Sequence, residues 1–113
     1  MTADDVRAIA LELPRASEAL VSDRVKYRVG RLVFLALSRD ETMMGFAFPK
    51  EERRALVDAE PETFLMPLPS DERYNWVRVR LAAIDHEQLY EIVVDAWRMC
   101  VPKKVAAAHE GVG

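Results

Sequence analysis

Apolar residues recur along this chain at two spacings, which divide it into predicted strands and predicted helices. In residues 26–37, KYRVGRLVFLAL, two arms rich in strand-forming residues meet at Gly30 and Arg31, a pattern that predicts a β-hairpin. A further strand is predicted over residues 42–48. Residues 74–81, YNWVRVRL, predict a strand with one buried face, because successive side chains of a strand point to opposite faces. In that strand Val77, Val79 and Leu81 face one way, and Trp76, Arg78 and Arg80 face the other.

One predicted helix opens the chain and a longer one lies near its end. The first helix ends at Pro14, and Thr2 and Asp5 suit the capping of its first turn. The long helix begins after Asp85, which forms a capping-box pair with Gln88. Apolar positions three and four residues apart define the buried stripe of each helix. These positions are Val6, Ile9, Ala10 and Leu13 in the first helix, and Leu89, Ile92, Val93, Ala96, Trp97 and Cys100 in the second.

The segments between these elements are shorter or irregular. The stretch through Ser17 and Ser22 is predicted to be a polar connection. Residues 50–59, KEERRALVDA, predict a surface helix opened by Pro49. Residues 60–73 contain three prolines and predict a long covering loop with room for a short edge strand. The surface helix is expected to offer Ala55, Leu56 and Ala59 to the core, and Pro102 to open a last short helix over residues 102–109.

The order of elements predicts one α+β domain over residues 1–113, with a frayed tail at about 109–113. We expect an antiparallel sheet of roughly four to six strands, with the first and the long helix packed on one face. A length of 113 residues and a hydrophobic content of 50% are sufficient for one core. The sequence has no apolar run of about 20 residues and no signal peptide, which predicts a cytoplasmic protein without a membrane association, by default a monomer.

Charge is unevenly distributed along the chain. The 16 basic and 19 acidic residues give a net charge of −3, so the field of the whole molecule does not attract polyanions. Residues 26–39 nevertheless contain four cations and no acid, and residues 73–80 contain three cations and no acid. Without these seven cations the chain would carry a charge of −10. If the two strands lie close together, they form a basic and aromatic surface for nucleic-acid phosphates and bases, with the candidate residues Lys26, Arg28, Trp76, Arg78 and Arg80.

Two other interpretations of this surface stay open. The cations are equally suited to the solvent-facing side of a half-exposed sheet, where arginine stems cover apolar atoms and their heads pair with carboxylates. The protein could also be an adaptor for a protein partner or a small ligand. Such an adaptor would use the same sheet face or the proline-containing loop at Phe64, Leu65 and Met66.

No recognisable motif for catalysis or for a cofactor occurs in the chain. It lacks a glycine-rich phosphate loop, a nucleophile elbow and an HExxH-like metal motif, so we expect a protein that is not an enzyme. His86 and His109 are predicted to be solvated, because neither has an identifiable orienting partner. Cys100 is the single cysteine, which excludes an internal disulfide, and it is expected to be a buried, inert thiol.

The order of these elements, together with several short motifs, resembles the MmcQ/YjbR family of small bacterial proteins. The resemblance spans nearly the whole chain and implies a frataxin-like (CyaY-like) fold with helices on one face of an antiparallel sheet. It also implies a DNA-binding role through a "double wing". The matching segments are the helix ending in Leu13-Pro14, the hairpin over 27–34, the strand Asn75-Trp76-Val77-Arg78-Val79, and Ala96-Trp97 followed by Pro102-Lys103-Lys104.

The resemblance raises two further points about individual residues. Frataxins use an acidic ridge to bind iron, but the first-turn acids of this chain are accounted for by the helix dipole, so we expect no metal site. The acids concerned are Asp4, Asp5, Glu12, Glu18 and Asp23. Many relatives carry a lysine two residues before the aromatic residue of the second hairpin arm, where this chain has Leu32. Neighbouring strand residues point to opposite faces, so Arg31 is not expected to replace that lysine.

Overall fold

The computed structural model describes the backbone of residues 1–112 and the side chains of residues 1–109. Six strands form one antiparallel sheet in the order β1-β2-β3-β4-β6-β5. The strands are β1 (Ala16–Val21), β2 (Arg24–Val29), β3 (Leu32–Leu37), β4 (Met43–Ala47), β5 (Phe64–Leu65) and β6 (Trp76–Arg80). The helices are α1 (Ala3–Ala10), α2 (Lys50–Ala59), α3 (His86–Arg98) and α4 (Lys103–Val112), with 3-10 turns at Pro69–Asp71 and Leu81–Ala83.

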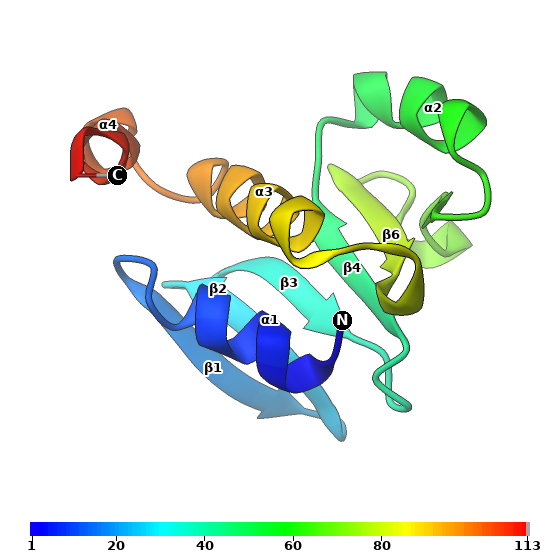
Figure 1. Cartoon of the computed structure of the whole chain (residues 1–113), viewed down its shortest axis with the longest axis horizontal. Coiled ribbons are helices and arrows are strands. Elements are labelled where there is room, and N and C mark those ends of the chain that lie inside the picture. Colours follow the sequence, from blue (N-terminus) through cyan, green and yellow to red (C-terminus); the bar gives the residue numbers. More distant parts are fainter. Residues whose placement is uncertain (113) are drawn as a thin grey trace.

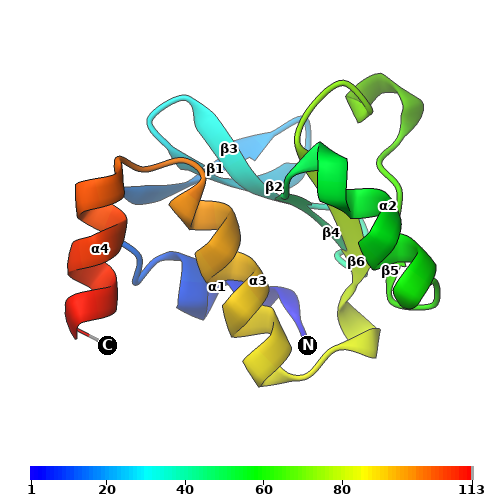
Figure 2. The same ribbon diagram turned by 90° about the horizontal axis from the view of Figure 1, so that it is seen from above.

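The helices are distributed unevenly around the sheet. Helices α1 and α3 lie side by side on one face of it (Figure 1). Helix α2 packs against β5 and β6, and Figure 2 shows α4 at the opposite end of the molecule. The predicted α+β architecture, with the first and the long helix on one face of an antiparallel sheet, is therefore confirmed.

The cross-strand register fixes which side chains face the helices, because directly opposed residues share a face of the sheet. Leu35 of β3 opposes Phe46 of β4, which in turn opposes Val77 of β6, and all three are buried. Trp97 of α3 is fully buried above this layer, and its Nε1 donates a hydrogen bond of 2.8 Å to the carbonyl oxygen of Pro14. This bond joins α3 to the turn that follows α1, a helix that ends at Ala10 and not at Pro14 as predicted. Other fully buried side chains are Val6, Tyr27, Phe34, Leu37, Met44, Val79, Leu81, Leu89 and Val93.

The hairpin and both capping boxes predicted from the sequence are present. Gly30 lies in the turn between β2 and β3 with a φ of 60°, a conformation that glycine adopts without steric cost. Thr2 and Asp5 form a capping box at α1. Asp85 and Gln88 form the second one, in which the Asp85 carboxylate accepts from the backbone N–H of Gln88 at 2.8 Å. These bonds set the starts of the two helices that cover the sheet.

The predicted polar connection through Ser17 and Ser22 is wrong, because residues Ala16–Val21 form strand β1. This strand lies at the edge of the sheet with most of its side chains exposed, so apolar alternation is weak there. Ser22 and Asp23 join it to β2 with φ values of 52° and 65°, as in a type I′ turn. Such turns are usually marked in a sequence by asparagine or aspartate followed by glycine, and that signal is missing here.

The expected core face of α2 is also corrected. Ala55 and Ala59 are exposed, and only Leu56 and Val57 are half-buried against the core. Pro49 occupies the N-cap position directly before the helix, one residue earlier than predicted. The helix packs against the sheet mainly at β5 and β6, so a narrow apolar stripe is sufficient for this contact.

Helix α4 is longer than the short segment predicted after Pro102, since it continues to Val112. His109 is half-buried, not solvated, with its ring centroid 5.1 Å from that of Trp97 in an edge-to-face arrangement. The frayed tail at about 109–113 stays a prediction, and Gly113 lies outside the described residues. None of the helices in the described part of the chain combines the length and apolarity needed to cross a membrane.

Candidate functional site

The face of the sheet opposite α1 and α3 carries a row of residues with a cation at each end. Lys26 of β2 opposes Ala36 of β3, Ala36 opposes Gly45 of β4, and Gly45 opposes Arg78 of β6. Adjacent strands lie about 4.8 Å apart, so the backbones of β2 and β6 are separated by about 14 Å. Because the two middle residues are small, the centre of the row is low. The register of the four strands therefore places a hollow between two long basic side chains.

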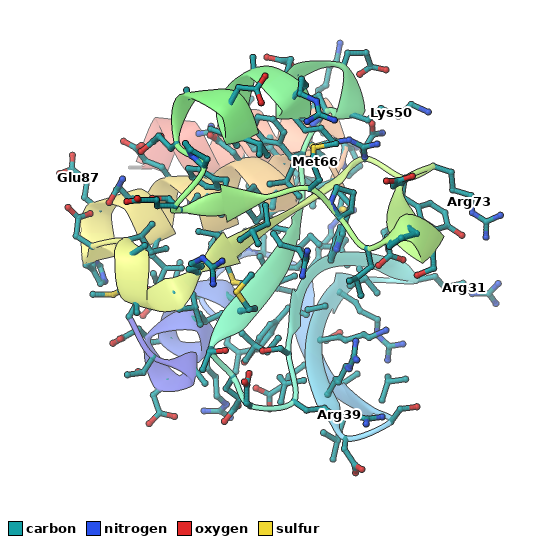
Figure 3. The ribbon with its side chains drawn as sticks, turned by 90° about the vertical axis from the view of Figure 1, so that its right-hand side faces the viewer. Arg31, Arg39, Lys50, Met66, Arg73 and Glu87 are labelled. Carbon is teal, nitrogen blue, oxygen red and sulfur yellow. The ribbon has the colours of Figure 1, made fainter. Side chains whose placement is uncertain are left out.

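This hollow is a groove of about 690 Å³. Its floor includes Val33, Ala36, Met43 and Gly45, and the ring of Trp76 contributes a large aromatic surface. One rim is the turn between β2 and β3, and the other is the loop that precedes β6. In Figure 3, Arg31 extends from the first rim and Arg73 from the loop, on the same side of the molecule.

The charge of the groove is opposite in sign to that of the chain. Four cations and a single carboxylate, that of Asp71, line it. The cations are Arg24, Lys26, Arg31 and Arg78. The groove thus has a formal charge of +3, whereas the chain as a whole has −3, which leaves −6 for all other residues. A local positive field in an acidic molecule favours an anionic ligand at this place.

The position of Trp76 depends on the absence of a side chain at Gly45. A Cβ atom at residue 45 would lie 2.5 Å from the indole Nε1 and 2.7 Å from two carbons of the ring. The indole therefore rests on the β4 backbone, in a place that only glycine leaves free. This contact holds the ring low in the groove and leaves Trp76 half-buried.

Arg78 is held by the loop that follows β5. Its Nε donates to the carbonyl oxygen of Met66 at 3.0 Å, and the side chain is half-buried. One hydrogen bond through Nε orients the planar guanidinium, whose Nη atoms are the donors best suited to a bidentate contact with an oxyanion.

The loop before β6 is fastened to helix α2. Arg53 donates to three backbone carbonyl oxygens, those of Glu72 at 2.6 Å, Tyr74 at 2.9 Å and Trp76 at 3.4 Å. The side-chain oxygen of Asn75 accepts from the backbone N–H of Lys50 at 3.0 Å. These bonds define the second rim of the groove. The sequence predicts α2 as a surface helix and gives no indication of this role of Arg53.

The aromatic rim residue Tyr74 is 52% exposed and is accompanied by a cation. The guanidinium carbon of Arg73 lies 4.9 Å from the centroid of the Tyr74 ring, and its Nη2 donates to the phenol oxygen at 2.8 Å. Tyr74 lines the groove, as do the exposed side chains of Leu32 and Leu68. The rim therefore combines positive charge with accessible apolar surface.

Of the five candidate residues named from the sequence, the structure brings three together. Lys26, Trp76 and Arg78 line the groove. Arg28 is half-buried at the other end of β2, where its Nε has no hydrogen-bond partner among the described residues. Arg80 is exposed and opposes Met43 at the far end of β6. Neither of these two arginines lines the groove.

Two cations of the groove, Arg24 and Arg31, were not among the candidates. Arg24 begins the run without acids, which extends from residue 24 to residue 39, and Arg31 lies in the turn between β2 and β3. Arg31 and Leu32 both line the groove, because the alternation of faces along a strand does not extend into a turn. That Arg31 does not replace the lysine of the relatives stays a prediction.

The acidic residues of the first quarter do not converge. The Asp5 carboxylate caps α1, and its hydrogen bonds with Thr2 lower its pKa. Glu18 accepts from Nε of Arg7 at 3.0 Å and from the Tyr27 hydroxyl at 2.8 Å. The described residues contain no group of three or more His, Cys, Asp or Glu side chains placed to hold a metal ion.

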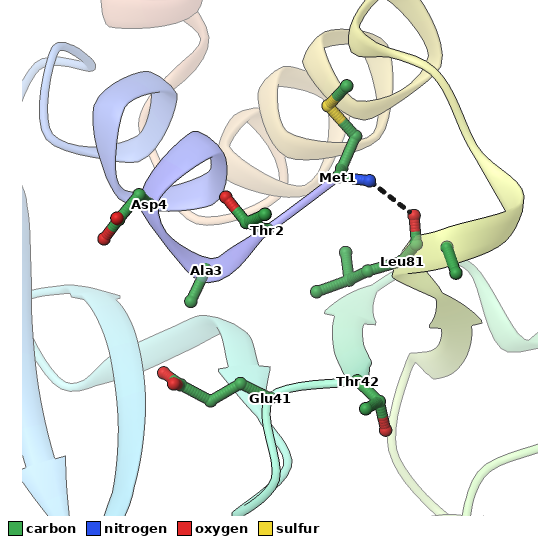
Figure 4. A pocket seen from close by; sticks show the side chains of 8 residues that line it. Met1, Thr2, Ala3, Asp4, Glu41, Thr42 and Leu81 are labelled. Atoms are coloured by element: carbon green, nitrogen blue, oxygen red, sulfur yellow. Dashed lines mark hydrogen bonds between the residues drawn. The ribbon is translucent and has the colours of Figure 1, made fainter.

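Two other features, a second pocket and the single cysteine, do not form a candidate site. A smaller pocket of about 390 Å³ lies beside the N-terminus, where the amino group of Met1 donates to the carbonyl oxygen of Leu81 at 3.0 Å (Figure 4). Its lining combines the acidic residues Asp4 and Glu41 with two threonines and with apolar side chains. Cys100 is half-buried, and burial raises the pKa of its thiol, which disfavours the reactive thiolate.

Comparison with known proteins identifies relatives of the fold. The YjbR family model matches residues 11–99. The crystal structure of Deinococcus radiodurans protein DR2400, which contains a DUF419 domain, superposes with a TM-score of 0.73 at 20% sequence identity. The match covers 87% of this chain and 77% of the other one. No curated protein matches the sequence.

Replacing Gly45 with alanine tests how the indole is seated. We expect Gly45→Ala to destabilise the protein by about 1–3 kcal/mol, because the new methyl group overlaps the Trp76 ring. In a Trp76→Ala background the same substitution should cost less than about 0.5 kcal/mol. Urea denaturation of the four proteins measures both values, and an equal cost in the two backgrounds would contradict this packing.

Replacing Arg53 with methionine tests the fastening of the loop. We expect Arg53→Met to destabilise the protein by about 1–3 kcal/mol and to speed amide hydrogen exchange in residues 72–76, because charged hydrogen bonds are lost. Arg54→Met is the matched control, since Arg54 is exposed and has only a 4.0 Å ion pair with Asp58. Similar effects of the two substitutions would argue against the role of Arg53.

Proposed function

The chain belongs to the YjbR family, and from the geometry of its groove we propose that it binds nucleic acid without catalysing a reaction. In this proposal the cations of the groove contact phosphate oxygens, and Trp76 contacts a base. Phosphate contacts supply most of the affinity in such complexes and fix the register of the protein on its ligand.

The observation that carries the proposal is the reversal of charge inside the groove. A chain with a net charge of −3 keeps four cations around one hollow and only Asp71 among them. Cations that merely cover a sheet surface would be expected to pair with carboxylates. None of the three ion pairs found among the described side chains involves a cation of the groove.

The identity and the placement of these cations also support phosphate as the ligand. Three of the four are arginines, whose planar guanidinium forms bidentate hydrogen bonds with phosphate oxygens. Lys26 and Arg78 stand at opposite ends of one row across the sheet, so their charges can reach successive groups of an extended polyanion. The aromatic surface between them suits a base, since every base has a π-face.

An adaptor that docks a protein or a small ligand is the competing function. Its location in the proline-containing loop is not supported, because Phe64 is buried and Leu65 and Met66 are half-buried. The exposed Leu32 and Leu68 at the rim of the groove favour apolar docking on the sheet face instead. The two functions differ in their response to salt, since counterion release makes phosphate binding steeply salt-dependent and apolar docking lacks this response.

Charge reversal at two groove residues tests the proposal. We expect the native protein to bind labelled DNA in fluorescence anisotropy with a log-log salt slope of about −2 to −4. The double substitution Arg24→Glu, Arg31→Glu should weaken binding at least tenfold, because both exposed side chains line the groove.

The matched control is Arg39→Glu, Arg80→Glu, which changes the net charge equally at two exposed arginines outside the groove. It should weaken binding less than about threefold, an effect of the long-range field alone. Equal losses in the two variants would assign binding to net charge and would contradict a site in the groove. No binding even at low salt would overturn the proposed function.

A further inference from the structure

We infer that the groove takes a single strand of nucleic acid in preference to a duplex, with one unstacked base lying on the indole of Trp76. This inference rests on the proposed function and narrows its ligand class. It follows from the shape of the groove, from the chemistry of its floor and from the way in which Trp76 is held.

The floor of the groove suits the face of a base and not its edge. Around the indole it is lined by Val33, Ala36 and Met43, and the indole itself covers the backbone of Gly45. These groups offer flat, apolar contact. In a duplex the faces of the bases are stacked on one another, and only their edges are accessible in the grooves. Only an unstacked base presents a π-face to such a floor.

The positive charge lies around a hollow and not on a single projecting element. Proteins that read a duplex usually insert a helix or a two-stranded ribbon into its major groove. Here the cations come from β2, from the β2–β3 turn and from β6, and they surround the floor between two rims. The backbones of β2 and β6 are about 14 Å apart, and side chains narrow this space further, so a strand fits between them more readily than a duplex.

The ring of Trp76, which forms the aromatic platform of the groove, is held in place before the ligand binds. The indole rests on Gly45, and the strand that carries it is fastened at its start by Arg53 through the carbonyl oxygen of Trp76. Tyr74 stands at the rim of the same groove and offers a second ring. A fixed ring loses little conformational entropy when a base stacks on it, which favours binding.

Electrostatics alone would produce the opposite preference. A duplex carries a higher density of phosphate charge than a single strand and releases more counterions for each contact. Tighter binding of the single strand therefore requires contact with the bases. This difference makes strand preference a sharp test of the platform.

The test compares three labelled probes of about 12 nucleotides, a length within the usual range for one single-strand-binding domain. They are oligothymidylate, a duplex of mixed sequence, and an abasic strand that has the phosphates and sugars but no bases. Anisotropy at one low salt concentration should give oligothymidylate at least tenfold tighter binding than either other probe. The fluorescence of Trp76 should be quenched by oligothymidylate and not by the abasic strand.

Substitution of the platform provides the second part of the test. Trp76→Leu should weaken binding of oligothymidylate by about 5- to 100-fold, the usual range for one stacked base, and leave the abasic strand unchanged. Tyr90→Leu is the control, because Tyr90 is an exposed aromatic residue of α3 outside the groove. Circular dichroism confirms that each variant is folded. The comparison of the three probes and the fluorescence quenching use the native protein. They therefore test base stacking on Trp76 even if Trp76→Leu fails to fold.

The outcomes separate the two proposals. Equal or tighter binding of the duplex, with the same salt slope, would overturn the single-strand inference and leave the proposed function standing. Equal binding of the abasic strand would overturn base stacking in the same way. Absence of binding to all three probes at low salt would overturn both proposals. If oligothymidylate binds as expected, an oligouridylate probe of the same length shows whether RNA or DNA binds more tightly.

Discussion

The contact between the Trp76 indole and the bare backbone of Gly45 determines the shape of the open sheet face. A side chain at residue 45 would force the ring away from the sheet, since the space above the backbone is already filled. With glycine there, the ring lies in the groove and the row from Lys26 to Arg78 stays low at its centre. The groove is thus a consequence of packing between two neighbouring strands.

The same strands that build the core hold the site rigid. In β6, Val77 and Val79 are fully buried beneath the helices, while Trp76 and Arg78 point to the other face. A strand anchored by its buried side has little freedom to move the residues of its open side. Helix α2 adds to this rigidity, because Arg53 binds three carbonyl oxygens in the segment that enters β6. Fold stability and site geometry therefore depend on the same contacts.

The sequence predicted the elements whose signals are local and strong. The alternation in β6 and the capping box at α3 each depend on residues only two or three positions apart, and the structure contains both as predicted. Strand β1 was missed because an edge strand needs few apolar residues and because Ser22 and Asp23 replace the usual residues of its turn. The α+β class did not depend on that strand.

The site was less predictable than the fold, for a physical reason. Lys26, Trp76 and Arg78 were named because they lie on predicted strands with a known alternation. Arg24 lies just before the predicted hairpin, which begins at Lys26, and Arg31 lies in the turn between β2 and β3, where alternation gives no direction. The groove also depends on a strand order that the sequence does not specify. The hydrogen bonds from Arg53 to backbone carbonyl oxygens join segments about 20 residues apart, and no local sequence pattern indicates them.

The central claim is that an anionic strand lies in this groove, and the two indole N–H signals in a ¹⁵N-correlated NMR spectrum test it most directly. The chain contains only two tryptophans. Trp76 lines the groove, whereas Trp97 is fully buried and donates its indole N–H to Pro14. Titration with oligothymidylate at low salt should shift the Trp76 signal progressively, leave the Trp97 signal in place, and be reversed by added salt. A Trp76 signal that stays fixed while the strand binds elsewhere would contradict the account.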